Sequence, residues 1–394
     1  MQPNRWIILI ALFAARASVG FQYQLVASAT PHLRRALGID IDQIGVLIGA
    51  YFITGLFLAL PAGVIGARFG ARATVLAGLA LMTFGGLVAA FTDSWPLQLA
   101  ARVTAGAGGV LVSVLMTKMV TDWFVGHETA TAMGIFVNSW PVGLAIALLT
   151  VPTLADVVGL RGVFLVSAGV AAFGFALVAF VYRDPPGLAA PAPGAAAVWP
   201  KGEGLALLVL AGLVWGCFNA GFAMTPAFGP AMLIGQGMSA VAAGSIVSIV
   251  LWLSMISVPA GGFLADRTGA PRAIIAGASL GAAALVLFAS GSASPALAFA
   301  ALGFVVGLPA GPIMALPSLA LKPTERAVGM GIFYTIFYLL MVLAPVAGGF
   351  VARAAGSAKP AFQAGAAGML VGLACFLAFV FIHARRTERE GSRP

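Results

Sequence analysis

Long runs of hydrophobic residues, separated by short polar turns, repeat along the whole chain. Stretches such as Trp6–Ala29, Leu205–Ala227 and Ala361–Ile382 each exceed the ~20 residues that a helix needs to cross ~30 Å of hydrocarbon. The alternating runs of about ten residues that are typical of barrel strands do not occur in the sequence. We therefore predict an all-α membrane protein with twelve transmembrane helices. The predicted helices cover residues 6–30, 42–65, 73–92, 96–120, 129–153, 160–182, 204–230, 239–264, 272–291, 295–320, 327–351 and 361–383.

Composition and charge support a membrane location. Hydrophobic residues make up 61% of the chain and charged residues 8%, a balance that soluble domains do not have. With the N-terminus in the cytoplasm, fourteen lysines and arginines fall on that side and five on the other, so we expect both termini in the cytoplasm and the protein in the inner (plasma) membrane. The net charge of +9 is scattered over short turns, so we expect no nucleic-acid partner.

The middle of the chain predicts two halves. Residues 184–204 are rich in Pro, Ala and Gly, which favours a linker between a six-helix bundle at 1–183 and a second one at 205–394. A glycine- and arginine-containing turn follows the second and the eighth predicted helix. Its two copies begin 199 residues apart, as duplicated halves require. The copies contain Gly63, Arg68, Gly70 and Arg72, and Gly262, Asp266, Arg267, Gly269 and Arg272.

At these residues the chain resembles the major facilitator superfamily of secondary transporters, whose loop motif is G-x-x-x-D-R-x-G-x-R in each half. The resemblance implies two pseudo-symmetric six-helix bundles and a gating role for the motif. The first copy departs from the pattern at Ala67, where the family has aspartate, and in the second copy Arg272 falls one place late.

Two interpretations of this motif remain open. The glycines permit tight turns and the arginines bind anionic headgroups. Alternatively, Asp266 lies at the N-terminus of the fifth helix near Thr129, where free N–H groups and the helix dipole favour a carboxylate by roughly 0.3–2 kcal/mol. Because Ala67 has no carboxylate, we expect only Asp266 to hold the cytoplasmic side closed.

The charges inside the predicted helices suggest a substrate. All twelve acidic residues, Asp122 among them, map to loops, tails or helix ends, whereas Arg16 and Arg102 lie inside the first and fourth helices. In the family these helices line the central cavity. A buried cation costs at least ~2.5 kcal/mol and needs a partner or a wet cavity, so we predict that both arginines bind an anionic substrate. The segment from Arg102 to Gly108 resembles the R-x-x-x-G-x-G motif of the superfamily. Arg102 could therefore instead bond backbone carbonyls within this motif, and Arg16 could snorkel to the membrane surface.

Other polar and aromatic side chains at comparable depth could complete the site, although each alone is more often a packing residue. The predicted substrate contacts are Gln22, Asn138, Asn219, Tyr334 and Tyr338; Tyr23, Trp140 and Trp215 lie at similar depth.

The sequence contains no pattern that is typical of a catalytic, metal-binding or nucleotide-binding site. The three histidines are far apart along the chain, the two cysteines are isolated in apolar runs, and Gly106–Gly109 is not followed by the Lys-Ser/Thr of a nucleotide-binding loop. We expect neither a metal nor a cofactor and no enzyme activity.

The sequence therefore predicts a monomeric transporter in the lipid bilayer that moves a small organic or inorganic anion by alternating access. Because no carboxylate or histidine lies at mid-membrane in the predicted helices, anion exchange, facilitated transport or protons carried with the substrate are favoured over a side-chain proton relay. At Arg16 the chain is also similar to the cyanate and nitroimidazole-related branch of the superfamily. The alternatives are efflux of hydrophobic compounds, with an apolar cavity formed by the many phenylalanines, and a non-transporting membrane sensor.

Overall fold

Helices form nearly the whole protein. The computed structural model describes residues 4–186 and 197–391, and these residues contain no strand. The helices are α1 (Arg5–Ser28), α2 (Thr30–Leu37), α3 (Ile41–Phe69), α4 (Ala71–Ala90), α5 (Trp95–Phe124), α6 (Thr129–Val137), α7 (Ser139–Phe180), α8 (Gly202–Gly235), α9 (Ala240–Thr268), α10 (Pro271–Ala289), α11 (Pro295–Gly307), α12 (Ala310–Ala320), the 3₁₀ turn η1 (Pro323–Glu325), α13 (Arg326–Ala355) and α14 (Ala358–Gly391). The all-α membrane fold is confirmed.

The number of membrane crossings depends on one glycine. Among the described residues, eleven helical stretches are long and apolar enough to cross a membrane. One of them, Thr129–Phe180, has 52 residues and would extend about 78 Å at 1.5 Å per residue, far beyond ~30 Å of hydrocarbon. It turns at Gly159, whose φ of 69° and ψ of 175° are not helical. α6 and α7 together therefore supply the fifth and the sixth of twelve crossings.

Two breaks interrupt predicted helices. In the tenth crossing α11 ends at Gly307 and α12 begins at Ala310, because the intervening Pro309 has no N–H to donate to the preceding turn. In the fifth crossing α6 ends at Val137 and α7 begins at Ser139. Each break frees backbone carbonyls inside an apolar helix, and these carbonyls need another donor.

Helix α2 was not predicted. Its eight residues are too few to cross a membrane, so a search for long apolar runs does not find it. Leu33 is buried in a hydrophobic cluster with residues of α1, α3 and α7, while Arg34 and Arg35 are exposed. The helix ends at Gly38, in the left-handed conformation that glycine adopts readily.

The residue contacts divide the chain into two compact units. Unit 1 comprises Met1–Phe124, Phe136–Trp199 and Pro323–Thr335; unit 2 comprises Val125–Ile135, Pro200–Lys322 and Ile336–Pro394. A short segment of each sequence half thus packs with the helices of the other half. Within the predicted linker at 184–204, residues 187–196 lie outside the described part of the chain, and the predicted division at this linker stays a prediction.

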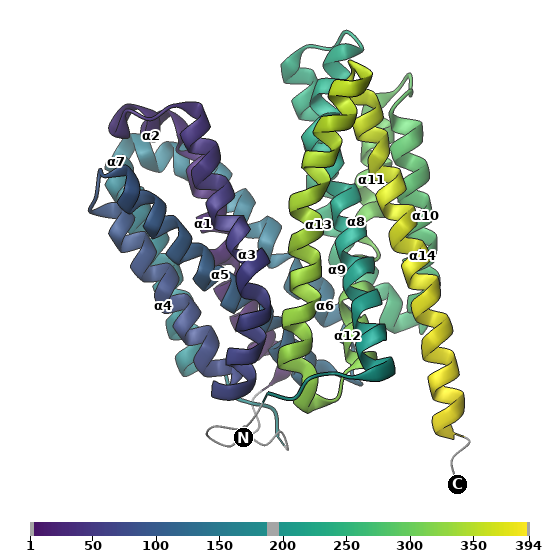
Figure 1. Ribbon diagram of the computed structural model, residues 1–394. Coiled ribbons are helices and arrows are strands. Elements are labelled where there is room, and N and C mark those ends of the chain that lie inside the picture. The colour runs from purple at the N-terminus through teal and green to yellow at the C-terminus, as the bar shows by residue number, and fades with distance from the viewer. Residues whose placement is uncertain (1–3, 187–196, 392–394) are drawn as a thin grey trace. The chain divides into compact units, whose positions relative to one another are not determined.

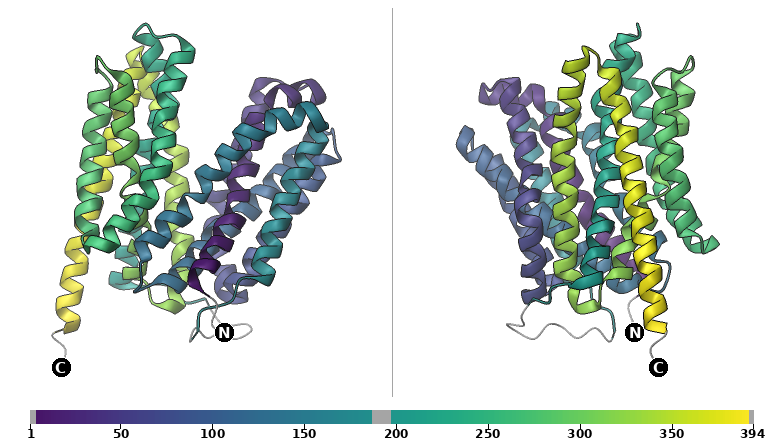
Figure 2. Two further views of the ribbon diagram at one scale, coloured as in Figure 1. Left: turned by 180° about the vertical axis from the view of Figure 1, so that it is seen from behind. Right: turned by 45° about the vertical axis from the view of Figure 1, so that its right-hand side comes forward.

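Each unit is a bundle of helices that pack side by side (Figures 1 and 2). In unit 1, α1 packs along α7, while α4 packs against both α5 and α7; in unit 2, α8 packs along α14 and α9 along α11. Close packing of α4 on α5 depends on small residues, since a Cβ at Gly78 would lie 2.8 Å from the carbonyl oxygen of Gly108. Gly277, in contrast, faces open space.

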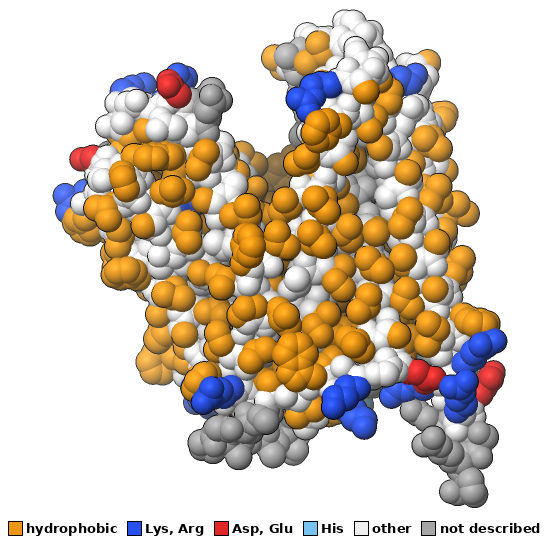
Figure 3. All heavy atoms as spheres, viewed as in Figure 1, with side chains coloured by type: hydrophobic (Ala, Val, Ile, Leu, Met, Phe, Trp, Pro, Cys, Tyr) orange, Lys and Arg blue, Asp and Glu red, His pale blue; other side chains and the backbone are white. Residues whose placement is uncertain are grey.

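The surface of the helices is apolar along their middle. Figure 3 shows hydrophobic side chains over most of the visible face, with lysines, arginines and acidic residues at the ends of the helices. Large side chains such as Phe57, Phe180 and Phe288 are more than half exposed. This distribution suits a hydrocarbon solvent around the protein.

Candidate functional site

The guanidinium of Arg16 lies at the break in the fifth crossing. Its Nη1 donates to the carbonyl oxygens of Phe136 (3.3 Å) and Val137 (3.4 Å) and to Oγ of Ser139 (3.0 Å), and its Cζ lies 4.7 Å from the centroid of the Phe136 ring. The two carbonyls end α6, where unpaired C=O groups carry the negative end of the helix dipole. The broken helix thus provides acceptors for a cation that is 7% exposed.

Two glycines allow this geometry. A Cβ at Gly20 would lie 2.4 Å from the carbonyl oxygen of Trp140, and one at Gly143 would lie 2.1 Å from that of Ala17. Backbones of α1 and α7 therefore touch where they cross, as small residues permit in membrane helices. This close crossing places Arg16 within reach of the break.

Part of the Arg16 guanidinium remains unused. Its Nε is buried and has no hydrogen-bond partner, and Nη2 donates to none of the residues that the structure describes. Every acceptor around it is neutral. Within the described ranges 4–186 and 197–391 no carboxylate pairs with Arg16, so its charge is offset only by dipoles.

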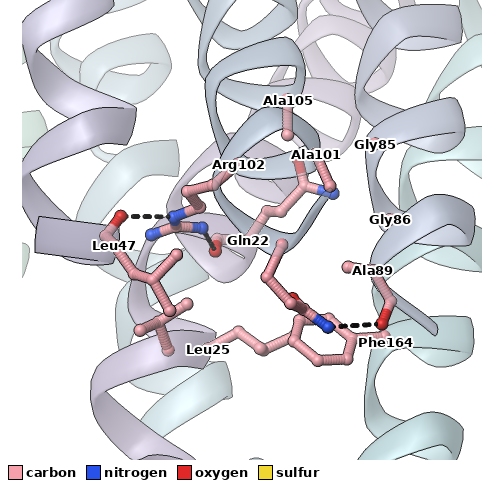
Figure 4. A pocket seen from close by; sticks show the side chains of 12 residues that line it. Gln22, Leu25, Leu47, Gly85, Gly86, Ala89, Ala101, Arg102, Ala105 and Phe164 are labelled. Atoms are coloured by element: carbon pink, nitrogen blue, oxygen red, sulfur yellow. Dashed lines mark hydrogen bonds between the residues drawn. The ribbon is translucent and has the colours of Figure 1, made fainter. Parts of the chain in front are cut away.

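Arg102 has a different environment (Figure 4). Its Nε donates to the carbonyl oxygen of Leu47 on α3 (2.9 Å), and Nη1 and Nη2 donate to those of Gln22 (2.6 Å) and Tyr23 (2.7 Å) on α1. Its Cζ also lies 4.4 Å from the centroid of the Tyr51 ring. These bonds accord with the interpretation of Arg102 as a backbone-binding residue, although its acceptors belong to other helices and not to its own motif. Its contact with substrate stays a prediction.

A small cavity lies beside Arg102 within unit 1. It measures about 20 Å³ as the space open to the centre of a water-sized sphere, and Gln22, Gln98 and Phe164 are among its lining residues. Nε2 of Gln22 donates to the carbonyl oxygen of Met82 (3.0 Å), while Oε1 is buried without a hydrogen-bond partner. The space is large enough to hold a water molecule.

The remaining predicted contacts belong to both units. Asn138 lies at the break beside the residues that Arg16 binds. The hydroxyl of Tyr334 hydrogen-bonds Oγ1 of Thr117 (2.8 Å) within unit 1. In unit 2, the side chain of Asn219 donates to the carbonyl oxygen of Trp215 in its own helix.

Tyr338 belongs to an aromatic cluster of unit 2. Its ring contacts Phe337, with centroids 5.2 Å apart, and Phe337 stacks on Trp215 at 6.1 Å. The predicted site residues are thus divided between the units, with Arg16, Gln22, Arg102, Asn138 and Tyr334 in unit 1 and Asn219 and Tyr338 in unit 2.

The second copy of the loop motif makes a helix cap. Oδ2 of Asp266 accepts from the backbone N–H of Thr131 (2.6 Å) and Oδ1 from that of Ala130 (3.3 Å), both in the first turn of α6. A Cβ at Gly262 would lie 2.3 Å from the carbonyl oxygen of Ala130, so a glycine is required for this approach. Asp266 therefore lies at the helix N-terminus that was predicted for it.

The first copy makes a different contact in unit 1. A Cβ at Gly63 would lie 2.5 Å from the carbonyl oxygen of Ala327 in the first turn of α13. Nearby, the buried carboxylate of Asp122 pairs with Arg326 (2.7 Å) at the start of α13 and with Lys118 (2.5 Å) in its own helix. Asp122 and Arg326 thus connect α5 to the start of α13, and the expectation that only Asp266 holds the cytoplasmic side closed stays a prediction.

The arginines of the two motif copies also differ. Arg72 donates to the carbonyl oxygen of Ala179 near the end of α7 (2.6 Å), whereas Arg272 is exposed and makes no hydrogen bond to the described residues. Arg68 and Arg267 are exposed, and each guanidinium lies over a phenylalanine ring. Gly70 and Gly269 both have positive φ at helix ends, which agrees with the tight turns predicted for them.

Sequence reasoning missed the ion cluster around Asp122. The fourth helix was predicted to end at residue 120, but α5 continues to Phe124 and buries this carboxylate. The spacing of Lys118 and Asp122, i and i+4, is the local pattern that could have indicated it. The partner Arg326, 204 residues away, has no such pattern.

A metal centre is not supported by the described residues. No group of three or more His, Cys, Asp or Glu side chains among them is placed to hold an ion, and Cys217 and Cys375 are free thiols.

Comparison with known proteins identifies the fold. Solved structures that are similar include the fucose:proton symporter FucP of E. coli, with a TM-score of 0.73 and 17% identity over 94% of this chain and 99% of that one. The human organic anion transporter MFSD10 has a TM-score of 0.72 and 15% identity over 95% of this chain and 100% of that one.

Curated relatives match shorter stretches. The inner membrane transport protein YajR of Escherichia coli is 29% identical over 36% of this chain and 31% of its own length. A hexuronate transporter of Bacillus subtilis is 22% identical over 66% of this chain and 64% of its length, and the multidrug transporter mfsC of Aspergillus fumigatus is 28% identical over 36% and 28%. The match thus spans about three-tenths of YajR and of mfsC.

The model of the Major Facilitator Superfamily matches residues 12–235 and again 216–394. These two matches together cover nearly the whole chain, including both copies of the loop motif and both broken helices. The chain therefore belongs to the major facilitator superfamily, and it is a multi-pass membrane protein.

Proposed function

We propose that this protein carries a small organic anion by alternating access, with Arg16 as the contact for the anionic group. The observation that supports the proposal is the buried guanidinium of Arg16, which has neutral partners and an unused edge. A guanidinium pairs with a carboxylate through two parallel hydrogen bonds. Among the described residues, the positive charge of Arg16 is stabilised by carbonyl and hydroxyl dipoles and not by a carboxylate. An anion that binds the unused edge would neutralise this charge.

The relatives support an organic anion without establishing it. The hexuronate transporter and the organic anion transporter MFSD10 are named for carboxylate or anionic substrates. The multidrug transporter mfsC is named for a broader class. Because Arg16 has no counter-ion among the described residues, the charge favours the anion over the efflux of hydrophobic compounds.

The helix-end contacts supply a means of switching. Asp266 caps α6 in unit 2, and Asp122 pairs with Arg326 of α13 in unit 1. Both contacts involve a short segment that is joined in sequence to the other unit. In the proposed cycle these contacts form in one state and break in the other, so their free energies bias the equilibrium between the two. The excess of basic residues on one side of the predicted helices supports our proposal that both chain termini lie in the cytoplasm and the protein in the inner membrane.

Substrate exchange is the proposed mode of coupling. Among the described residues the buried carboxylate is that of Asp122, and two cations hold it. A proton carrier would need a carboxylate or histidine without such partners. We therefore expect counterflow of a carboxylate in proteoliposomes to persist when a proton ionophore is present. Uptake that collapses with the ionophore would contradict exchange.

The direct test replaces Arg16. Binding of acetate, benzoate, glucuronate, sulfate and the hydrophobic cation tetraphenylphosphonium is measured by isothermal titration with the full-length chain in detergent. We expect one or more carboxylates to bind, Arg16→Ala to abolish that binding, and Arg16→Lys to restore it only in part because lysine lacks the planar fork. Arg161→Ala is the matched control, since Arg161 is exposed on α7. Binding of tetraphenylphosphonium alone, or unchanged affinity in Arg16→Ala, would overturn the proposal.

A further inference from the structure

Three aromatic rings from three helices meet in unit 1, one of them two helical turns along α1 from Arg16. Tyr23 on α1, Phe52 on α3 and Trp140 on α7 form a triangle, with centroid distances of 5.3 Å (Tyr23–Trp140), 5.7 Å (Tyr23–Phe52) and 6.3 Å (Phe52–Trp140). All three side chains are only partly buried, and all belong to unit 1. We call these residues the aromatic triangle.

The polar edges of the triangle are not used by the protein. Among the described residues, none receives a hydrogen bond from the hydroxyl of Tyr23 or the indole N–H of Trp140. Neither atom is among those enclosed without a partner. Tyrosine and tryptophan at this depth normally find a partner for these groups. Two donors on accessible rings therefore indicate a ligand with several acceptor oxygens.

The triangle and Arg16 lie along one seam. Arg16, Gly20 and Tyr23 are spaced i, i+4 and i+7 on α1, which puts them on one face of the helix. At Gly20 the backbone of α1 touches that of Trp140, and Trp140 directly follows Ser139, which Arg16 binds. The seven residues from Arg16 to Tyr23 correspond to about 10 Å along the helix. One small molecule can span that distance.

Arg102 holds the triangle in position. Its guanidinium donates to the carbonyl oxygens of Tyr23 and Gln22, and Tyr51, whose ring lies under Arg102, also contacts the ring of Tyr23 at 5.8 Å. The backbone of Tyr23 is therefore fixed by a buried cation on α5. Arg102 acts on the triangle as a positioning residue.

We infer that the substrate is a polyhydroxylated carboxylate, with its carboxylate on Arg16 and its hydroxyl-bearing carbon chain against the Tyr23–Phe52–Trp140 triangle. This inference rests on the proposed function, because it assumes that Arg16 binds the anion. The C–H groups of such a chain pack on the ring faces, while its hydroxyl oxygens accept from Tyr23 and Trp140. A purely aromatic or aliphatic acid would leave both donors without a partner, which is unfavourable in a site shielded from water.

Three probes of similar size separate the charge from the hydroxyl groups. D-Glucuronate carries both, D-glucose lacks the charge, and cyclohexanecarboxylate lacks the hydroxyl groups. Binding to the full-length protein in detergent is measured by isothermal titration. We expect glucuronate to bind more tightly than either of the others, by roughly tenfold or more, since each hydrogen bond adds on the order of a two- to tenfold gain.

Conservative variants assign that preference to the triangle. Tyr23→Phe removes one hydroxyl and keeps the ring, and Trp140→Phe removes the indole N–H. We expect each to weaken glucuronate binding by roughly three- to tenfold and to leave cyclohexanecarboxylate binding unchanged. Trp252→Phe is the matched control, because Trp252 is an exposed tryptophan on α9 of unit 2. Thermal unfolding of each variant verifies that the fold is retained.

The two levels of the proposal fail in different ways. If glucuronate and cyclohexanecarboxylate bind equally and both depend on Arg16, the inference about hydroxyl groups is overturned while the anion site stands. If glucuronate binding is unaffected by Tyr23→Phe and Trp140→Phe together, the triangle is not the hydroxyl site. If no carboxylate binds at all, the proposed function itself fails.

Discussion

The two copies of the loop motif fix a helix end by different chemistry. In unit 2, the carboxylate of Asp266 caps the N-terminus of α6 through two backbone N–H groups. In unit 1 the matching position is Ala67, and a buried carboxylate on another helix, Asp122, pairs with Arg326 at the start of α13. Both units retain a glycine, Gly262 or Gly63, where the helices cross.

The comparison shows which part of the motif the geometry requires. A glycine occurs at the crossing in both units because the backbone of the partner helix occupies the position that a Cβ would need. No residue with a side chain fits there. The carboxylate need not recur at the same position, because a helix end accepts charge from any nearby element. Removing one partner of a buried ion pair leaves the other charge buried and strongly lowers the free energy of unfolding. Removing a helix cap lowers it much less, so mutations at the two contacts should differ in effect.

The largest effect is expected at Asp122. Asp122→Ala leaves the buried Arg326 and the partly buried Lys118 without this counter-ion, which should lower the free energy of unfolding by about 3–5 kcal/mol. Thermal and denaturant unfolding in detergent measure this. Glu203→Ala, which breaks the exposed pair with Arg389, is the control and should change stability little. An Asp122→Ala protein as stable as the control would show that the ion cluster is not a structural contact.

The crossing glycines should come next, and equally in both units. Gly63→Ala and Gly262→Ala each place a methyl group within 2.5 Å of a backbone oxygen, a clash that typically costs about 1–3 kcal/mol. Gly277→Ala is the control, because its Cβ would meet open space and alanine favours a helix. The midpoint of thermal unfolding in detergent, compared between each variant and the parent protein, measures this loss of stability. A clear loss in Gly277→Ala, or none in the other two, would contradict the role assigned to the crossings.

Asp266→Asn should have a smaller effect that appears in the conformational equilibrium. The amide keeps one acceptor oxygen for the N–H groups of Ala130 and Thr131, but it loses the second acceptor and the charge at the helix end, a change of roughly 0.3–2 kcal/mol. We expect a two- to thirtyfold shift toward the inward-facing state, and the opposite shift in Ala67→Asp.

Reactivity of cysteines engineered on each side of the membrane, with Cys217 and Cys375 replaced, reports that equilibrium. Equal reactivity in Asp266→Asn and the parent would show that the cap does not bias the states.

The smallest effect separates two arginines that occupy similar places in the motif. Arg72→Ala removes one hydrogen bond to the carbonyl oxygen of Ala179 and should cost about 0.5–1.5 kcal/mol. Arg272 is exposed, so Arg272→Ala should leave the unfolding midpoint unchanged. Equal losses in the two variants would mean that both arginines act through the lipid headgroups.

Hydropathy predicts the helices because each crossing must satisfy its own backbone in lipid. The fold class, the number of crossings and the bend at Pro309 could therefore be read from local pattern. α2 was not predicted because its eight residues are too few to cross a membrane. α5 was predicted four residues too short because Asp122, a charged residue, was assigned to the loop that follows.

The candidate site was predictable only in part. Arg16 and Arg102 stand out as buried cations in sequence, but their partners do not, since Arg16 binds residues 120–123 positions away and Arg102 binds residues 55–80 positions away. Arg102 has a hydrogen-bond acceptor for each of its three nitrogens, whereas Arg16 does not. This difference depends on where the helices cross, which hydropathy does not predict. For the same reason, no local sequence pattern around Asp122 or Arg326 predicts that the two residues pair.

Gly159 has a practical consequence for experiments on membrane topology. It is the one residue in α7 whose backbone is not helical, and nothing else separates the fifth crossing from the sixth. A connection this short gives a protease, an antibody or an inserted epitope nothing to reach. A count of crossings from helix length and hydropathy alone would merge the two, give eleven instead of twelve and put the C-terminus on the opposite side of the membrane from the N-terminus.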